Sequence, residues 1–178
     1  MAIEDAVIFS SLTEARLLIG NPELFSIFQT SFVRAVNKKS AASIKNIIEA
    51  RDKERVEYGE TAYLLRPNVK RSRGGLRDIH LIRWLGFIRF GTNNFGELLK
   101  RGGISTTDSK QLHRSQEFLL QIRNEMHFHA DKPADGLGRN EQVRLAEWLG
   151  HEDTEAMMGV EGFMRCLLYT SPSPRDRG

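Results

Sequence analysis

A cluster of cations beside a glycine pair lies between Arg66 and Arg89. Seven lysines and arginines occupy this stretch against one acid, Asp78, although the whole chain carries a net charge of only +3. Backbone N–H groups at the start of a helix, next to a glycine turn and several cations, can bind a phosphate or another anion. We predict phosphate or partner binding by the following residues: Lys70, Arg71, Arg73, Gly74, Gly75, Arg77 and Asp78.

A purely structural role accounts for the same residues and stays open. Pro67 disfavours the helical conformation at Arg66, and Gly74 and Gly75 allow backbone conformations that are closed to other residues. In this interpretation the glycines only close a turn, the arginines are solvated, and Asp78 satisfies the helix N-terminus. Basic loops without ligands are common, so charge alone does not decide between the two roles.

Motifs of the common catalytic centres are missing from the sequence. There is no Walker-type phosphate loop, no His-Glu-x-x-His, no Gly-x-Ser-x-Gly and no cysteine cluster. There is also no Asp-x-Asp pair after a Gly-Ser or Gly-Gly, which two-metal nucleotidyl transfer requires, and no histidine directly followed by aspartate. We predict that this chain carries no catalytic residue of its own.

The spacing of the histidines argues against a metal site. His127 and His129 are two positions apart, so on a helix they point in roughly opposite directions and cannot share an ion. We expect instead a surface histidine at a helix C-terminus, where its charged form is favoured. For His80 we expect packing rather than acid–base chemistry, because no partner carboxylate is evident beyond Asp78.

Composition is that of a single-domain protein from a reducing compartment. The chain has 178 residues and one cysteine, which excludes an internal disulfide. No apolar run approaches the ~20 residues that span a membrane, and the start lacks the features of a secretion signal. We therefore expect a cytoplasmic protein with no membrane partner, no nucleic-acid partner and no metal or other cofactor bound by this chain.

Apolar periodicity and capping residues predict an all-α bundle of about seven helices, with at most one short extended segment at Ala62–Leu65. From Leu76 to Phe90, apolar side chains surround nearly the whole helical circumference, which indicates a buried central helix. Other helices are expected up to Ile19, from Pro22, from Ile44 to Glu60, from Asn93 or Asn94 to Leu99, from Thr106 or Thr107 to about Ala130, from Asn140 to Gly150 and from Asp153 or Thr154.

Side-chain patterns assign inward faces to these helices. The first helix has an apolar stripe that runs from Ile8 to Ile19 and shows no N-cap. The third ends in the charged stretch Arg51–Glu60, which we expect to project into solvent or toward a partner. The side chains expected to point inward elsewhere are Leu112, Leu119, Ile122 and Met126 in the longest helix, Met157, Val160 and Met164 in the last, and Trp84 and Trp148.

The last thirteen residues differ from the rest of the chain. From Cys166 the sequence resembles the read-through translation of a transposase adapter used to prepare DNA sequencing libraries. The Ser-Pro repeat that begins at Ser171 also cannot continue a helix. We predict one helical domain at residues 1–165, as a fragment of a larger enzyme, and a non-native tail at residues 166–178.

The segment Thr61–His80 resembles the signature of the bifunctional uridylyltransferase/uridylyl-removing enzymes, which modify the PII nitrogen-signalling protein. Leu12–Asn21 and Phe118–His127 are similar to flanking helices of that family. Family members usually have an acid in place of Arg66 and a proline in place of Arg73. The loop in this chain is therefore more basic than the family pattern.

The resemblance implies a position within a larger enzyme. In that family a nucleotidyltransferase domain with metal-binding carboxylates, which uses Mg²⁺, transfers UMP from UTP to a tyrosine of PII. A His-Asp domain removes the UMP. This chain is similar to the non-catalytic helical region between the two, so the implied partners are PII, UTP and the neighbouring domains of the same chain. By implication Lys70, Arg71 and Arg77 contact nucleotide phosphates or the acidic surface of the partner.

Two other interpretations stay open. The glutamine synthetase adenylyltransferases share the Gly-Gly-x-Arg-Asp-Ile core but usually continue with Glu-Phe, whereas this chain continues with His80 and Leu81. The chain is alternatively a stand-alone helical module that binds an anion or a protein through its loop. The coding sequence on either side distinguishes these possibilities.

Overall fold

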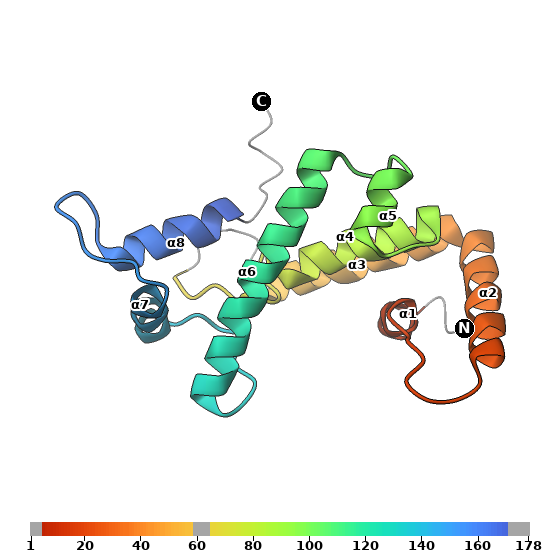
Figure 1. Ribbon diagram of the computed structural model, residues 1–178, viewed down its shortest axis with the longest axis horizontal. Helices are drawn as coiled ribbons and strands as arrows, with labels where there is room; N and C mark the ends of the chain where they lie inside the picture. The colour runs from red at the N-terminus through yellow and green to blue at the C-terminus, as the bar shows by residue number, and fades with distance from the viewer. Residues whose placement is uncertain (1–4, 59–64, 171–178) are drawn as a thin grey trace. The chain divides into compact units, whose positions relative to one another are not determined.

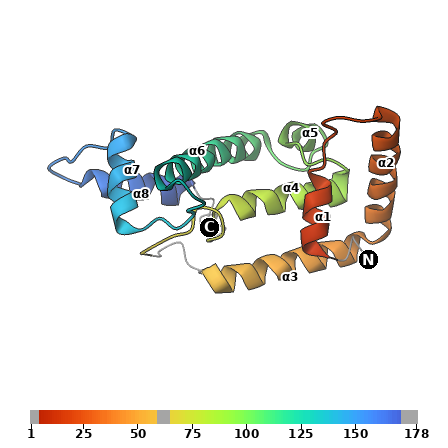
Figure 2. The same ribbon diagram turned by 90° about the horizontal axis from the view of Figure 1, so that it is seen from below.

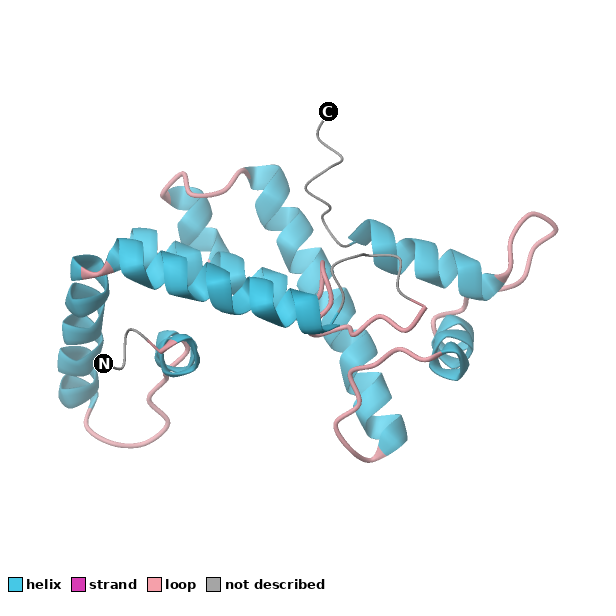
Figure 3. Cartoon of the chain, turned by 180° about the vertical axis from the view of Figure 1, so that it is seen from behind, coloured by secondary structure: helices cyan, strands magenta, loops and turns pink. Residues whose placement is uncertain are grey.

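The described part of the chain is built from helices joined by loops (Figures 1 and 3). The computed structural model describes residues 5–58 and 65–170. Within these ranges there is no strand, only one isolated antiparallel bridge, so the all-α prediction is confirmed. The helices are α1 (Ala6–Thr13), α2 (Pro22–Lys38), α3 (Ser40–Tyr58), α4 (Leu76–Phe90), α5 (Phe95–Lys100), α6 (Thr106–Ala130), α7 (Arg139–Trp148) and α8 (Gly159–Thr170).

The extended segment predicted at residues 62–65 lies outside the described residues, except for Leu65. None of the described helices combines the length with the hydropathy that a membrane crossing needs.

The helical chain divides into two compact units, and the borders between them fall inside helices. One unit runs up to Lys53 and also contains His80–Ser109. The other contains Glu54–Ile79 and the chain from Lys110 onward. Helices α3, α4 and α6 therefore each contribute residues to both units.

Aromatic side chains form the core of the first unit. The ring of Phe9 lies 5.9 Å from that of Phe32 and 6.4 Å from that of Phe87, between ring centroids. Trp84 and Ile88 of α4 are buried in the same cluster. Helix α1 carries Phe9 into this core beside α2, α3 and α4 (Figure 2).

The extent predicted for the first helix is wrong, and of its predicted inward stripe Leu12 packs against the core whereas Ile8 and Ile19 are exposed. Helix α1 ends at Thr13, and Ile19 is 94% exposed. Asp5 caps its start, since the carboxylate accepts hydrogen bonds from the backbone N–H groups of Val7 and Ile8. The buried side chain is Phe9, because packing among aromatic rings outweighs the regular apolar spacing that predicted a longer helix.

Helices α2 and α4 form as the sequence predicts. Asn21 caps α2 through its side-chain oxygen, and Pro22 occupies the first helical position. In α4 no residue from Leu76 to Ile88 is exposed, which confirms the buried central helix. Its glycine, Gly86, allows close packing against α5.

The second unit contains most of α6 together with α7 and α8. The predicted seam of α6 is confirmed, because Leu112, Leu119, Ile122 and Met126 are all buried. Helices α7 and α8 pack against each other and cross in Figure 2. Trp148 of α7, in contrast, is 46% exposed, so the prediction that it lies in the core is wrong.

The starts of α7 and α8 differ from the predicted ones. Gly138, rather than Asn140, takes the N-cap position of α7 and makes no side-chain cap. Helix α8 begins at Gly159, whose N–H donates to the Asp153 carboxylate at 2.7 Å. The predicted inward side chains of this region are only partly buried, whereas Phe163 and Leu167 are buried.

Helix α8 continues into the segment assigned to a non-native tail. It runs to Thr170 and buries Leu167, two positions beyond Arg165. The division at residue 165 stays a prediction.

Candidate functional site

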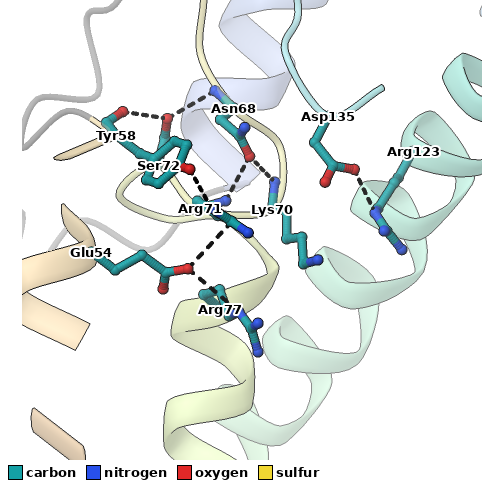
Figure 4. Close-up of polar contacts among 9 residues, drawn as sticks. All are labelled: Glu54, Tyr58, Asn68, Lys70, Arg71, Ser72, Arg77, Arg123 and Asp135. Atoms are coloured by element: carbon teal, nitrogen blue, oxygen red, sulfur yellow. Dashed lines mark hydrogen bonds and ion pairs between the residues drawn. The ribbon is translucent and has the colours of Figure 1, made fainter. Parts of the chain in front are cut away.

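The basic loop between α3 and α4 folds back on itself through two short polar side chains. The Asn68 side-chain oxygen accepts hydrogen bonds from the backbone N–H groups of Lys70 and Arg71, at 3.0 and 2.8 Å. The Ser72 hydroxyl accepts from the N–H of Asn68 at 2.8 Å and donates to the Tyr58 carbonyl at 3.2 Å. These bonds fix the backbone that carries the cations (Figure 4).

The N–H groups at the start of α4 bond within the chain. Those of Leu76 and Arg77 donate to the carbonyls of Val69 and Lys70, at 3.1 and 2.9 Å. The Gly74 N–H donates to the Asp78 carboxylate at 2.7 Å. The helix start is therefore stabilised internally, and any anion bound here has to be held by side chains.

The charged end of α3 contacts this loop. Glu54 forms ion pairs with Arg71 and Arg77, at 3.4 and 3.6 Å, and Arg55 pairs with Asp78 at 2.8 Å. These side chains are only partly exposed. The expectation that this end projects into solvent is wrong for these residues, because the loop and the first turn of α4 supply their counter-charges.

Arg71 is the cation most firmly held by α3. Its guanidinium lies 4.6 Å from the centroid of the Tyr58 ring and donates a hydrogen bond to the Tyr58 hydroxyl. With the Glu54 ion pair, the Arg71 head group makes three interactions with side chains of α3. Arg71 is therefore bound to α3 rather than simply solvated.

The connection between α6 and α7 pairs with the basic loop. The N–H of Val69 donates to the Asp135 carbonyl at 2.9 Å, and the N–H of Leu137 donates to the Pro67 carbonyl at 2.8 Å. This isolated antiparallel bridge joins Asn68 to Gly136. It brings the side chain of Asp135 to the same place as the cations.

The Asp135 carboxylate binds two side chains of α6. It accepts a hydrogen bond from Arg123 Nε at 2.7 Å and lies 2.9 Å from His127 Nε2. Burial raises the pKa of this carboxyl, but the hydrogen bonds from Arg123 and His127 outweigh burial and hold the pKa below its ordinary value. Asp135 is therefore an ionised counter-charge at neutral pH.

Lys70 lies among cations. In Figure 4 its side chain extends between those of Arg77 and Arg123. Burial, then the positive charge of Arg77, lowers the pKa of Lys70 below its ordinary value; Arg123 and Arg71 act in the same direction, and only Asp135 opposes them. Among the residues that the structure describes, its ammonium forms no hydrogen bond or ion pair.

The predicted site residues thus separate into groups. Gly74, Gly75 and Asp78 shape the helix start, and Arg71 is bound to α3. Arg73 makes no hydrogen bond or ion pair with the described residues. Lys70 and Arg77 lie together with three residues that the sequence analysis did not assign to this site, which are Glu54, Arg123 and Asp135.

The histidines of α6 do not share a site. His127 contacts Asp135, whereas His129 lies 3.7 Å from Glu141. The His127 side chain is 23% exposed and that of His129 is 54% exposed, so His129 fits the single surface histidine predicted at the helix C-terminus. Within the described ranges no group of three or more His, Cys, Asp or Glu side chains is placed to hold a metal ion.

Comparison with known proteins identifies the family. A sequence model described as GlnD PII-uridylyltransferase matches residues 42–171. Proteins named bifunctional uridylyltransferase/uridylyl-removing enzyme are 34% identical in Nitrosococcus oceani, 30% in Rhodospirillum rubrum and 33% in Burkholderia lata. These alignments cover 96%, 97% and 96% of this chain, but 19%, 18% and 20% of those proteins.

No solved structure matches the chain. The chain spans about a fifth of the length of the curated relatives it matches. The family match includes the whole basic loop, its α3 contacts and the connection that carries Asp135. On this match, the chain belongs to the PII-uridylyltransferase family.

Proposed function

We propose that this chain is the non-catalytic helical region of an enzyme that transfers UMP from UTP to a PII signal protein and removes it again by hydrolysis. The family match over residues 42–171 carries this proposal. The chain spans about a fifth of its relatives, and in this proposal the two active centres belong to other parts of the parent protein. We assign them to a nucleotidyltransferase domain and a His-Asp domain of the same cytoplasmic enzyme.

Mg²⁺ belongs to the parent enzyme in this proposal. The described residues offer no cluster of three or more metal-binding side chains. They do not fit a resident Mg²⁺, and no step of the chemistry is assigned to them. We place the ion with the carboxylates of the nucleotidyltransferase domain.

The basic loop is the part of this region that we propose to act in binding. Lys70, Arg71, Arg73 and Arg77 supply its positive charge, toward nucleotide phosphates or an acidic surface of PII. Gly74, Gly75 and Asp78 hold the loop against α4. The hydrogen bonds of Asn68 and Ser72 support the proposal, because they fix the backbone before any ligand arrives.

Charge reversal in an intact homologue tests the binding role. Glutamate in place of the residues equivalent to Lys70 and Arg77 should weaken the affinity for UTP or for PII about tenfold, since two attractions become repulsions. Unchanged affinity for both would exclude a contact role for the loop.

The coding sequence on either side of this chain tests the parent function. We expect an Asp-x-Asp nucleotidyltransferase domain before Ile3 and a His-Asp domain after the helical region. Two transferase halves without a His-Asp domain would indicate an adenylyltransferase relative. A gene without either catalytic domain would indicate a stand-alone binding module.

A further inference from the structure

The second unit carries an unbalanced positive charge at the basic loop. Lys70 lies near three arginines, because Arg77, Arg123 and Arg71 each lower its pKa. Two carboxylates oppose them, because Glu54 pairs with Arg71 and Arg77 while Asp135 pairs with Arg123. Lys70 pairs with neither carboxylate, so its charge is left for a bound anion to neutralise.

Donor groups at this place are not used by the described residues. The Lys70 ammonium forms no hydrogen bond or ion pair with them. Arg123 donates to Asp135 through Nε, and its two terminal nitrogens form no further bond with the described residues. Lys70 and Arg123 therefore have N–H groups available, whereas Arg71 is occupied by Glu54 and Tyr58.

We propose that Lys70, Arg77 and Arg123 form a binding site for a phosphate group, with the Asp135 carboxylate as its internal counter-ion. The proposal deepens the binding role proposed above for the basic loop and rests on it for the source of the phosphate. It differs in assigning Arg123 to the site and in excluding Arg71 and Arg73. The bound phosphate replaces repulsion among the cations with attraction to each of them.

A phosphate fits this site better than a carboxylate for two reasons. It carries up to two negative charges, whereas a carboxylate carries one, and it offers three acceptor oxygens to donors from different directions. The donors come from the loop, from α4 and from α6, so a group with several oxygens is needed to reach all of them. The Asp135 carboxylate, which is already present, accepts a hydrogen bond from only one of these three donors, Arg123.

Titration of the purified full chain with inorganic pyrophosphate at low ionic strength tests the proposal. Lys70→Met keeps the apolar stem and removes the charge, and Lys132→Met is its control, because Lys132 is exposed and lies outside the site. Arg123→Gln is matched by Arg114→Gln on the same helix, where Arg114 is exposed. We expect calorimetry to show at least fivefold weaker binding for Lys70→Met and Arg123→Gln, and less than a twofold change for the controls.

Asp135→Asn provides a test in the opposite direction. Removing the internal counter-ion should tighten pyrophosphate binding severalfold, because the carboxylate no longer competes for Arg123 and Lys70. Far-UV circular dichroism confirms that the helices persist in each variant. If Asp135→Asn loses helicity, Lys70→Met decides alone, since the Lys70 ammonium makes no bond that the fold depends on.

Absent binding, equal weakening by the control variants, or tight binding of an acidic peptide in place of pyrophosphate would overturn the proposal. UTP in a parallel titration distinguishes the source: affinity equal to that of pyrophosphate indicates recognition of phosphate alone, and higher affinity indicates a nucleotide. These titrations use only this chain, so their failure leaves the parent function, which is tested by the flanking coding sequence, intact.

Discussion

Two adjacent glycines at the start of α4 serve different structural needs. Gly74 has a φ of 78°, in the left-handed region that residues with a Cβ adopt only at a cost. Gly75 is instead limited by space, since a Cβ there would lie 2.9 Å from the Val69 carbonyl oxygen and 3.0 Å from those of Lys70 and Ser72. The carbonyl groups of the loop therefore lie so close to Gly75 that a side chain has no room at this position.

Alanine substitutions separate these two effects. Gly74→Ala should lower the free energy of unfolding by about 1 kcal/mol, the cost of a left-handed conformation. Gly75→Ala should lower it by about 2 kcal/mol or more, because three backbone oxygens would have to move. Chemical denaturation of both variants measures the difference, and equal losses would contradict the steric account of Gly75.

The lowered pKa of Lys70 makes stability depend on pH. The folded chain releases this proton more easily than the unfolded chain, whose lysine keeps the ordinary value of 10.5. The penalty is therefore fully present at neutral pH and disappears as pH rises through the lowered pKa toward 10.5. Lys70→Met should stabilise the chain at pH 7 by about 0.5 kcal/mol, as expected for a partly exposed charge.

Denaturation from pH 7 to pH 10.5 checks this sign. The advantage of Lys70→Met over the original chain should shrink as pH rises, whereas Lys132→Met should show no such trend. A variant less stable than the original chain at pH 7 would mean that Lys70 is held by attraction rather than repulsion. Together with the binding test, this predicts that Lys70 favours ligand binding at the expense of stability.

At the scale of the elements, the sequence predicts helices wherever the signals are local. The caps at Asn21 and Asn94 and the apolar circumference of α4 all lie within a few residues of the helix they define. The sequence pattern predicted a longer α1 because it did not show that Phe9 packs against aromatic rings of α2 and α4. Contacts between residues far apart in the sequence decide which side chain of α1 is buried, and no local sequence pattern indicates them.

The candidate site was predictable only in part for the same reason. The loop cations and the glycine pair are contiguous in sequence, so their grouping could be predicted. Arg123 and His127 are four positions apart on α6, which places them on one face. Their partner Asp135 comes from the following connection, and its pairing with the basic loop depends on the long-range bridge at Asn68.

The packing of α4 on α5 depends on a missing side chain. A Cβ at Gly86 would lie 2.6 Å from Leu98 Cδ1, and Leu98 is 1% exposed. Gly86→Ala should therefore destabilise the chain by about 1–3 kcal/mol despite the better helix propensity of alanine. Leu98→Ala should cost about 3 kcal/mol by leaving a cavity.

Combining the two substitutions tests the contact directly. In the double variant the new methyl group enters the space that Leu98 leaves, so its loss of stability should be smaller than the sum of the single losses. Denaturant titration of the four proteins gives the coupling. Strict additivity would show that Gly86 and Leu98 do not limit each other.

At the scale of the whole molecule, the two units share three helices. The borders at Lys53, Ile79 and Ser109 each lie within a helix rather than in a linker. Helix formation is cooperative along a continuous segment, so melting of one unit removes support from helices of the other. We predict a single unfolding transition.

The two tryptophans report on this prediction, because Trp84 belongs to the first unit and Trp148 to the second. In Trp148→Phe the fluorescence comes from Trp84, and in Trp84→Phe it comes from Trp148. Each fluorescence midpoint should coincide with the midpoint from circular dichroism of the same variant. Separate midpoints would show that the units unfold independently.

The bridge between Asn68 and Gly136 also sets an order of events during synthesis. The two residues are 68 positions apart, so the ribosome must complete α6 before the segment that pairs with the basic loop exists. Until then the Val69 N–H lacks its acceptor and Lys70 lacks the nearby carboxylate. A nascent chain released before residue 135 would therefore carry a loop with all of its cations and without one of the two acids that restrain them.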